Sequence, residues 1–319
     1  MSFAFIESDF KVDFPLPVKL SERFTLANAT AEQLQEIKER LAMIGQFVSA
    51  PCDTYEYDWT VTKTVDGTNE SSSTSVPIPL PPSEWRYRVV FFDGDNNQSL
   101  LELESAFCLL KQGIHIGFVS FNFGVMHHDE FAFRFYSDYR RIHAWPRNLT
   151  QGDVAAVRKY FQLITEVGFD APVITALRSF HDLRGLNPNS PHQVLACFAI
   201  LEALLTHEPN VKDIGEPSLT HQLKTKLVLV ERIFERPLDY STFVPKNEGE
   251  DKAKWKRKIW ADLYSYRSCI AHGNRFDFSK DFKRFGTPEK ALTFLREVTK
   301  LTLILALEQP QFIEDLKTV

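Results

Sequence analysis

The sequence lacks the features that mark membrane and secreted proteins. Its apolar runs are all shorter than the roughly 18 residues that a membrane-spanning helix needs, so we expect none. The N-terminal segment has acidic residues early and no long apolar stretch, which argues against a signal peptide. The chain has only four cysteines and no Cys-x-x-Cys pair, so we expect reduced, mostly buried thiols in a cytoplasmic protein.

Common nucleotide-binding and hydrolase motifs are also missing. We find no Walker loop, no dinucleotide fingerprint, no serine nucleophile elbow and no internal repeat. The net charge of −5 argues against a uniformly basic nucleic-acid surface, but it allows a local basic groove.

A metal site is a further class that the sequence does not favour. His127, His128 and Asp129 are adjacent, but neighbouring residues of a strand point to opposite faces, and no third ligand has suitable spacing. We therefore expect no metal ion and no other cofactor. A metal hydrolase built around His127 and His128 is kept as an alternative, and it would lose its activity to a chelator.

The chain does have the length for two domains and a large number of phenylalanines. It contains 319 residues, of which 44% are hydrophobic and 25% are charged, as in ordinary globular proteins. The 27 Phe residues predict dense aromatic packing. We place a domain boundary near residue 150, because the sequence pattern changes there.

Residues 1–150 show the pattern of a mixed α+β domain. Residues 30–45 predict a helix, because Thr30 and Gln33 have the spacing of a capping box. Residues 66–83 are rich in Gly, Ser, Asn and Pro, which predicts a long loop. Runs of β-forming residues predict strands at 55–63, 85–92, 114–124 and 131–137.

Residues 151–319 show the pattern of an all-α domain. Helical periodicity covers most of the region, and Gly-, Pro- and Asn-containing segments interrupt it. The segment 192–207 is apolar nearly all round, so we expect it at the centre of a helical core. The expected helices are 150–168, 171–186, 192–207, 219–234, 252–273 and 287–310.

The stretch LYSYRSCIAHGN, residues 263–274, closes one of these helices. Apolar residues recur along the helix at steps of three or four and form one stripe. Gly273 stands where a C′ glycine belongs, so the helix should end at Ala271 or His272. The residues of the stripe are Trp255, Ile259, Leu263, Tyr266 and Ile270.

Arg267 and His272 are the chemically distinctive residues of this helix. Arg267 lies at the edge of the apolar stripe, where its guanidinium needs a partner. His272 follows five residues later, which on an unbroken helix places it about 140° away around the axis. The two side chains meet only if the last turn unwinds at Gly273 or if a second subunit completes the site. The sequence leaves both routes open.

An arginine, a histidine and an acid together are suited to cutting RNA without a metal. Arg267 offers fixed donors for a phosphate, and the imidazole of His272 can take up and release protons. RNA supplies its own nucleophile, the 2′-hydroxyl. Glu202 lies in a very apolar helix, needs a partner, and would orient the histidine or hold the arginine. The structural alternative is an arginine in a salt bridge and an exposed histidine at a helix end.

The helices of this region resemble a known family. The mark of the HEPN superfamily (higher eukaryotes and prokaryotes nucleotide-binding) is Arg, four to six residues, then His near a helix end, here Arg267 and His272. The ordered segments ALRSFHDLRGL, HQVLACFAILEALLTH, LTHQLKTKLVLVERIF and LYSYRSCIAHGN resemble its ApeA-like branch, over about residues 171–310. The resemblance implies a four-helix bundle that forms a homodimer, with two Arg–His pairs meeting in a cleft at the interface.

The resemblance also implies an activity and residue roles. Active members are metal-independent endoribonucleases of toxin or antiphage defence systems, and we expect products with 2′,3′-cyclic phosphate and 5′-hydroxyl ends. By motif position, Arg267 would hold phosphate, His272 would do acid–base work and Glu202 would be the supporting acid. Ser268 departs from the many members that have Asn, Asp or His there. Asn274 stands where one toxin branch has a Tyr that its antitoxin modifies, which argues against that mode of control.

A basic run at the start of the motif helix is a candidate RNA contact, because positive charge opposes the helix dipole there. A solvated helix face would explain the run equally well. We expect the RNA-binding residues to be Ser268, Asn274, Lys254, Lys256 and Arg257. The cations that would extend the patch, if the fold gathers them, are Lys224, Lys226, Arg275, Lys280, Lys283 and Arg284.

The runner-up function belongs to another class. It is a non-catalytic HEPN module, whose bundle serves dimerisation or the binding of nucleotide or RNA. Residues 1–150 lie outside the resemblance, and by analogy they would sense a trigger or recognise a substrate. The two functions differ in whether Arg267 and His272 converge.

Overall fold

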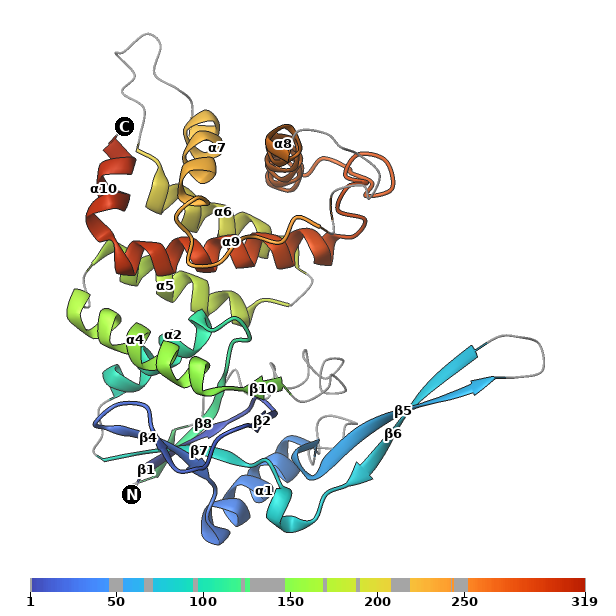
Figure 1. Ribbon diagram of the computed structural model, residues 1–319, viewed down its shortest axis with the longest axis vertical. Helices are drawn as coiled ribbons and strands as arrows, with labels where there is room; N and C mark the ends of the chain where they lie inside the picture. The colour runs from blue at the N-terminus through green and yellow to red at the C-terminus, as the bar shows by residue number, and fades with distance from the viewer. Residues whose placement is uncertain are drawn as a thin grey trace. The chain divides into compact units, whose positions relative to one another are not determined.

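The computed structural model divides the chain into two compact units, Met1–Phe161 and Gln162–Val319 (Figure 1). The first unit has mixed α and β structure and is followed by helices, as the sequence predicts. The residues that the structure describes are 2–45, 54–65, 71–93, 97–121, 124–126, 147–168, 171–187, 190–207, 219–241, 243 and 252–318.

Six described strands of the first unit form a sheet in which every neighbouring pair is antiparallel. Their order is β3-β4-β7-β1-β8-β9. Strand β1 pairs with both β7 and β8, so all five of its residues are buried. The strands are β1 (Ser2–Ile6), β3 (Val18–Lys19), β4 (Phe24–Asn28), β7 (Arg88–Phe92), β8 (Ile116–Phe121) and β9 (Gly124–Met126).

Helix α1 (Ala31–Gly45) packs on this sheet and begins with the predicted capping box. The backbone N–H of Thr30 donates to Gln33 Oε1 at 2.9 Å, and that of Gln33 donates to Thr30 Oγ1 at 3.3 Å. These bonds satisfy two N–H groups near the helix start, which confirms the prediction. The apolar cluster between α1 and the sheet includes Phe3, Phe5, Ile37, Leu41, Val89 and Phe118.

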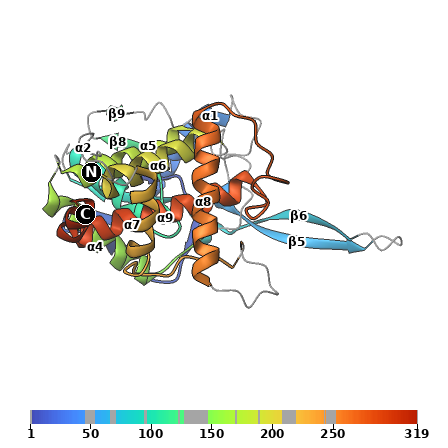
Figure 2. The same ribbon diagram turned by 90° about the horizontal axis from the view of Figure 1, so that it is seen from above.

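Strands β5 (Tyr57–Val65) and β6 (Ser71–Pro79) form a separate hairpin, which Figures 1 and 2 show as a long ribbon. The expectation of a loop through residues 66–83 is therefore wrong for β6, which pairs with β5 over nine residues. Pro77 and Pro79 fit because β6 has one strand partner in this two-stranded sheet, so one of its edges needs no N–H donors. The predicted strand at 131–137 lies outside the described residues.

Arg86 ties the base of this hairpin to the rest of the first unit. Its guanidinium donates to both carboxylate oxygens of Asp9, at 2.6 and 2.9 Å, and to Asp58 at 3.1 Å. It also donates to the backbone carbonyls of Thr54 and Tyr57, at 3.2 and 2.5 Å. Burial raises the pKa of the Asp9 carboxyl and outweighs the opposite effect of Arg86.

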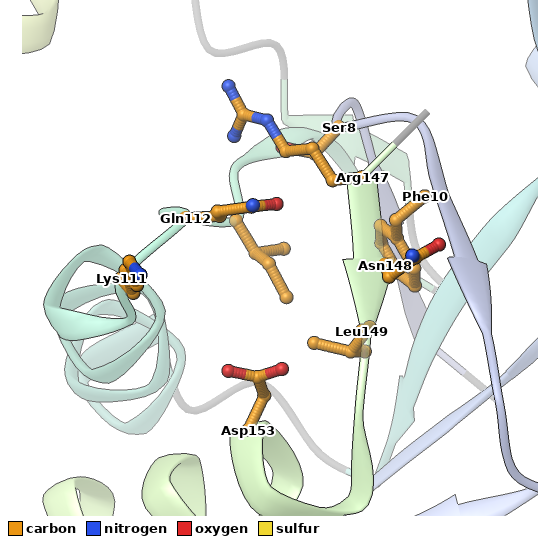
Figure 3. A pocket seen from close by; sticks show the side chains of 9 residues that line it. Ser8, Phe10, Lys111, Gln112, Arg147, Asn148, Leu149 and Asp153 are labelled. Carbon is orange, nitrogen blue, oxygen red and sulfur yellow. The ribbon is translucent and has the colours of Figure 1, made fainter. Parts of the chain in front are cut away.

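A cavity of about 130 Å³ lies beside the parallel strand pair β2 (Phe10–Val12) and β10 (Arg147–Leu149). Figure 3 shows the side chains of Gln112, Leu149 and Asp153 directed toward it. The Asp153 carboxylate already accepts the backbone N–H of the residue before helix α4, at 2.9 Å, and so caps that helix. The acidic group of the cavity is therefore used by the fold. Helix α2 of this unit spans Asn97–Leu109, and helix α4 (Gln151–Val167) begins in this unit and ends in the second.

The second unit is built around helix α6, the nearly all-apolar segment. This helix packs against α5, α7, α8, α9 and α10, which gives it the central place expected for it. None of the helices in the described part of the chain has the length and apolar character to cross a membrane. The helices are α5 (Pro172–Asp182), α6 (His192–Leu205), α7 (Leu219–Val230), α8 (Lys252–Ala271), α9 (Pro288–Glu308) and α10 (Pro310–Thr318).

Candidate functional site

Helix α8 carries the motif residues, and its apolar stripe holds it in the second unit (Figure 2). Four of the five predicted stripe residues are buried, and Ile270 near the end is half-buried. The chain beyond the helix folds back over Tyr266, whose ring lies 5.0 Å from the rings of both Phe276 and Phe278 and 5.3 Å from that of Phe282. The position of the motif is thus fixed by packing on both sides of Arg267.

Helix α8 ends as the sequence predicts, at Ala271 with Gly273 in the left-handed region. The N–H of Asn274 donates to the carbonyl of Cys269 at 2.9 Å, and that of Gly273 donates to Ile270 at 3.2 Å. These two bonds are the Schellman arrangement, and Gly273 has a φ of +67°, which a glycine adopts at little cost.

His272 still belongs to the regular helical path. Its N–H donates to the carbonyl of Ser268 at 3.1 Å, so the last turn does not unwind before it. His272 therefore stays on a different side of the helix from Arg267. No hydrogen bond or ion pair joins these two side chains in the described part of the chain. The described structure therefore does not show the route through an unwound last turn, and a contribution from a second subunit stays a prediction.

Arg267 instead reaches toward helix α6. Its Nη2 lies 3.5 Å from Oε1 of Glu202, which brings together two of the predicted site residues from distant parts of the sequence. The two side chains are 28% and 19% exposed, so the pair lies at the edge of the core and is open to solvent. The Nε of Arg267 is buried and has no hydrogen-bond partner among the described residues. The guanidinium thus has donors that the fold does not use.

Tyr264 is part of the same cluster, and the sequence analysis did not single it out. Its ring centroid lies 5.5 Å from Cζ of Arg267 and 5.3 Å from Nζ of Lys224, which comes from α7. Phe198 of α6 holds the ring from another side, edge-on at 5.8 Å. The spacing of three residues between Tyr264 and Arg267 was the available signal, because such residues are neighbours on a helix surface.

The remaining motif residues lie near the end of α8. His272 and Asn274 are exposed, and Ser268 is half-buried. Cys269 is half-buried as well, with a free thiol. The exposed imidazole of His272 is accessible to a ligand that approaches from solvent.

The basic run at the start of α8 is only partly available for RNA. The ammonium group of Lys256 forms an ion pair with Glu231 and lies 5.0 Å from the ring of Tyr240. Arg257 is exposed. Lys254 belongs to the helix, but its side chain lies outside the described residues.

Two of the cations that would extend the patch are engaged elsewhere. Lys226 is buried, and its Nζ donates to the carbonyl of Lys317 at 3.1 Å, so the expectation for this residue is wrong. Burial lowers the pKa of its amino group. Arg284 forms an ion pair with Asp262. Lys224 is the cation that the fold does bring beside Arg267.

The described residues were also compared with the requirements of a metal site, and the chain was compared with known proteins. Among the residues that the structure describes, no three His, Cys, Asp or Glu side chains gather to hold a metal ion. His127 and His128 lie outside these residues. Comparisons of the chain with family models, with curated proteins and with solved structures found no match.

Proposed function

We propose that this protein is a metal-independent endoribonuclease whose second unit is a HEPN-type helical domain. The observation that carries the proposal is the partly exposed ion pair between Arg267 of α8 and Glu202 of α6, together with the exposed His272 directly after the end of α8. A guanidinium with unused donors can bind a phosphate, and a histidine nearby can transfer protons. The resemblance of the helices and of the motif spacing to the ApeA-like HEPN branch supports the same assignment.

The chemistry needs only groups that RNA and this chain supply. Arg267 binds the scissile phosphodiester, and Glu202 holds the guanidinium in place. His272 takes the proton of the 2′-hydroxyl or gives a proton to the leaving 5′ oxygen. The 2′ oxygen forms a bond to phosphorus and the bond to the 5′ oxygen breaks. The products are a 2′,3′-cyclic phosphate and a 5′-hydroxyl.

A homodimer is part of this proposal. On one regular helix, Arg267 and His272 are about 140° apart around the axis. Two copies that place their α8 helices side by side would combine an arginine face of one with a histidine face of the other. The biological role that we propose is that of a cytoplasmic toxin or antiphage defence effector. In this role, the first unit would recognise the trigger or the substrate.

The test is RNA cleavage by the full chain in the presence of EDTA. We expect the wild-type protein to cut RNA and leave 2′,3′-cyclic phosphate ends, and we expect His272→Ala and Arg267→Ala to abolish the cutting. His192→Ala and Arg232→Ala are matched controls, because both residues are exposed and lie outside the site. Circular dichroism of each variant shows whether it is folded.

The outcomes separate the candidate functions. Equal cleavage by all five proteins would mean a contaminant or another site. Cleavage that EDTA stops would favour the metal hydrolase around His127 and His128. If the wild-type protein binds RNA without cutting it, the non-catalytic HEPN module is the better description.

A further inference from the structure

Two cationic groups from different helices share the ring of Tyr264. Cζ of Arg267 lies 5.5 Å from the ring centroid, and Nζ of Lys224 lies 5.3 Å from it. The two cations are therefore no farther apart than these two distances laid end to end. The two cations repel each other. An anion that binds between them adds two attractive interactions that offset this repulsion.

The charges of this cluster do not balance. Glu202 forms an ion pair with Arg267, but no described carboxylate forms one with Lys224. The cluster of Lys224, Arg267 and Glu202 therefore carries one positive charge beyond what its own acid neutralises. Within the residues that the structure describes, no carboxylate supplies the missing partner, so an anionic ligand could neutralise this charge.

The arginine is also bound loosely by its acid. Its 3.5 Å contact with Glu202 is longer than the ~2.7–2.9 Å of a strong charge-assisted hydrogen bond. Nε of Arg267 has no hydrogen-bond partner among the described residues. Nε is buried, so a ligand would reach the guanidinium through the Nη groups of the partly exposed side chain, and a phosphodiester offers acceptor oxygens for such groups.

Tyr264 is placed to set the spacing of the two cations. Its ring is held edge-on by Phe198 at 5.8 Å, and the cations on it come from α7 and α8. Each cation–π contact is worth about 0.5–1 kcal/mol at a partly exposed site, enough to favour one side-chain position over others. The contacts with Tyr264 thus favour the positions that Lys224 and Arg267 have in the absence of a ligand.

We propose that Lys224, Tyr264 and Arg267 form a phosphate clamp, in which the two cations hold one phosphodiester of single-stranded RNA. Lys224 binds the substrate directly, and Tyr264 is a positioning residue that acts through the two cations. The identity of the ligand as RNA rests on the proposed function. The clamp itself rests on the distances, the charges and the unused donors of these residues.

The test measures binding in the absence of cleavage. The full-length protein carrying His272→Ala is titrated into a fluorescent single-stranded 2′-O-methyl RNA, which lacks the attacking hydroxyl, and anisotropy is recorded at several salt concentrations. Lys224→Gln should weaken binding roughly tenfold. It should also lower the dependence of log K on log salt by about 0.7, the value for one contact to a single strand. Lys224→Arg should retain most of the affinity.

Lys258→Gln is the matched control. It removes the same charge, and its Nζ likewise lies on an aromatic ring of α8, 4.8 Å from the centroid of Trp255. We expect this variant to bind nearly as well as the parent protein. Tyr264→Phe keeps the ring and should bind normally, whereas Tyr264→Leu should bind as weakly as Lys224→Gln. Thermal unfolding checks that each variant is folded.

The clamp is overturned if Lys224→Gln binds like the parent, if Lys258→Gln weakens binding as much, or if the parent does not bind the RNA. These results can be told apart from a failure of the proposed function. Cleavage by the wild-type protein without any effect of Lys224→Gln would keep the nuclease and remove the clamp. Binding that depends on Lys224, in a protein whose wild-type form cuts no RNA, would keep the clamp and remove the nuclease.

Discussion

Arg86 in the first unit and Arg267 in the second unit both pair with carboxylates, but they do so in opposite surroundings. The Arg86 side chain is 3% exposed, and it donates to Asp9, Asp58 and two backbone carbonyls. The Arg267 side chain is 28% exposed and has one longer ion pair, with Glu202. One guanidinium is fully used by the fold, and the other keeps donors for something else.

The two ion pairs differ in whether the fold uses the hydrogen-bond donors of the arginine or leaves some of them available to a ligand. A buried charge is tolerated only if its hydrogen bonds are made inside the protein, and Arg86 meets that requirement. The exposed part of the Arg267 guanidinium does not need such partners, because solvent can satisfy it, whereas its Nε is buried and has no partner among the described residues. Unused donors at a rigid position are what a binding site requires. The following predictions test this contrast, from the largest expected effect to the smallest.

Removal of the Arg86 side chain should have the largest effect on stability. Arg86→Ala removes the guanidinium that donates to both oxygens of the Asp9 carboxylate and leaves it only the electrostatic effect of Arg88, so we expect a loss of about 3–5 kcal/mol in the free energy of unfolding. Urea denaturation, with hydrogen exchange of β1 and β7 as a local readout, measures the loss. Arg40→Ala removes the arginine of a helical pair with Glu36 in the same unit and should cost less than about 1 kcal/mol. Equal losses in the two variants would contradict the structural role of Arg86.

Removal of the Arg267 side chain should show the reverse pattern. Arg267→Ala should abolish detectable RNA cleavage, which corresponds to a rate at least roughly a hundredfold lower, because the guanidinium that binds the reacting phosphate is lost. Its free energy of unfolding should change by less than about 1 kcal/mol, since the pair is partly exposed. Arg267→Lys should recover only part of the rate, because it keeps the charge without the planar fork. A destabilisation as large as that of Arg86→Ala would make Arg267 a structural residue.

Lys226 provides a third case, a buried cation without a carboxylate beside it in the described structure. Its pKa is lowered from 10.5 by burial, so the native state gives up the proton at a lower pH than the unfolded state does. The cost of burying the charge therefore disappears as the pH rises through the lowered pKa toward 10.5. Relative to Lys226→Met, the wild-type protein should gain stability over that range, by about 1.4 kcal/mol for each unit of the pKa shift. Urea titrations of both proteins between pH 7 and pH 10 measure the gain, and parallel pH profiles would argue against it.

Replacement of Lys256 should have a smaller effect than replacement of Arg86, Arg267 or Lys226. Its ammonium group is held by Glu231 and lies on the ring of Tyr240, so it is less available to RNA than the exposed Arg257 is. We expect Lys256→Gln to change RNA affinity less than Arg257→Gln does, and to cost less than about 1 kcal/mol of stability. Anisotropy titrations of the two variants compare them directly. A larger loss for Lys256→Gln would restore the lysine as a phosphate contact.

Local features of the fold were predictable because they depend on hydrogen bonds between near neighbours. The capping box of Thr30 and Gln33 and the left-handed Gly273 at the end of α8 involve residues a few positions apart. Strand β6 was missed for the opposite reason. Its Ser- and Pro-rich sequence is typical of a loop, and the strand exists because β5 supplies a hydrogen-bonding partner.

The candidate site divides along the same line. Periodicity and one glycine sufficed to place Arg267 on the edge of a packed helix that ends at Ala271, directly before His272. Only the tertiary structure decided which charges are used: Lys256 by Glu231, Lys226 by the carbonyl of Lys317, and Lys224 beside Tyr264. Helical order arises from interactions over three or four residues, whereas the partners of a charge are set by which helices pack together. The sequence therefore determined the helix and its motif residues, and the packing of α6, α7 and α8 decided which cations remain available for a ligand.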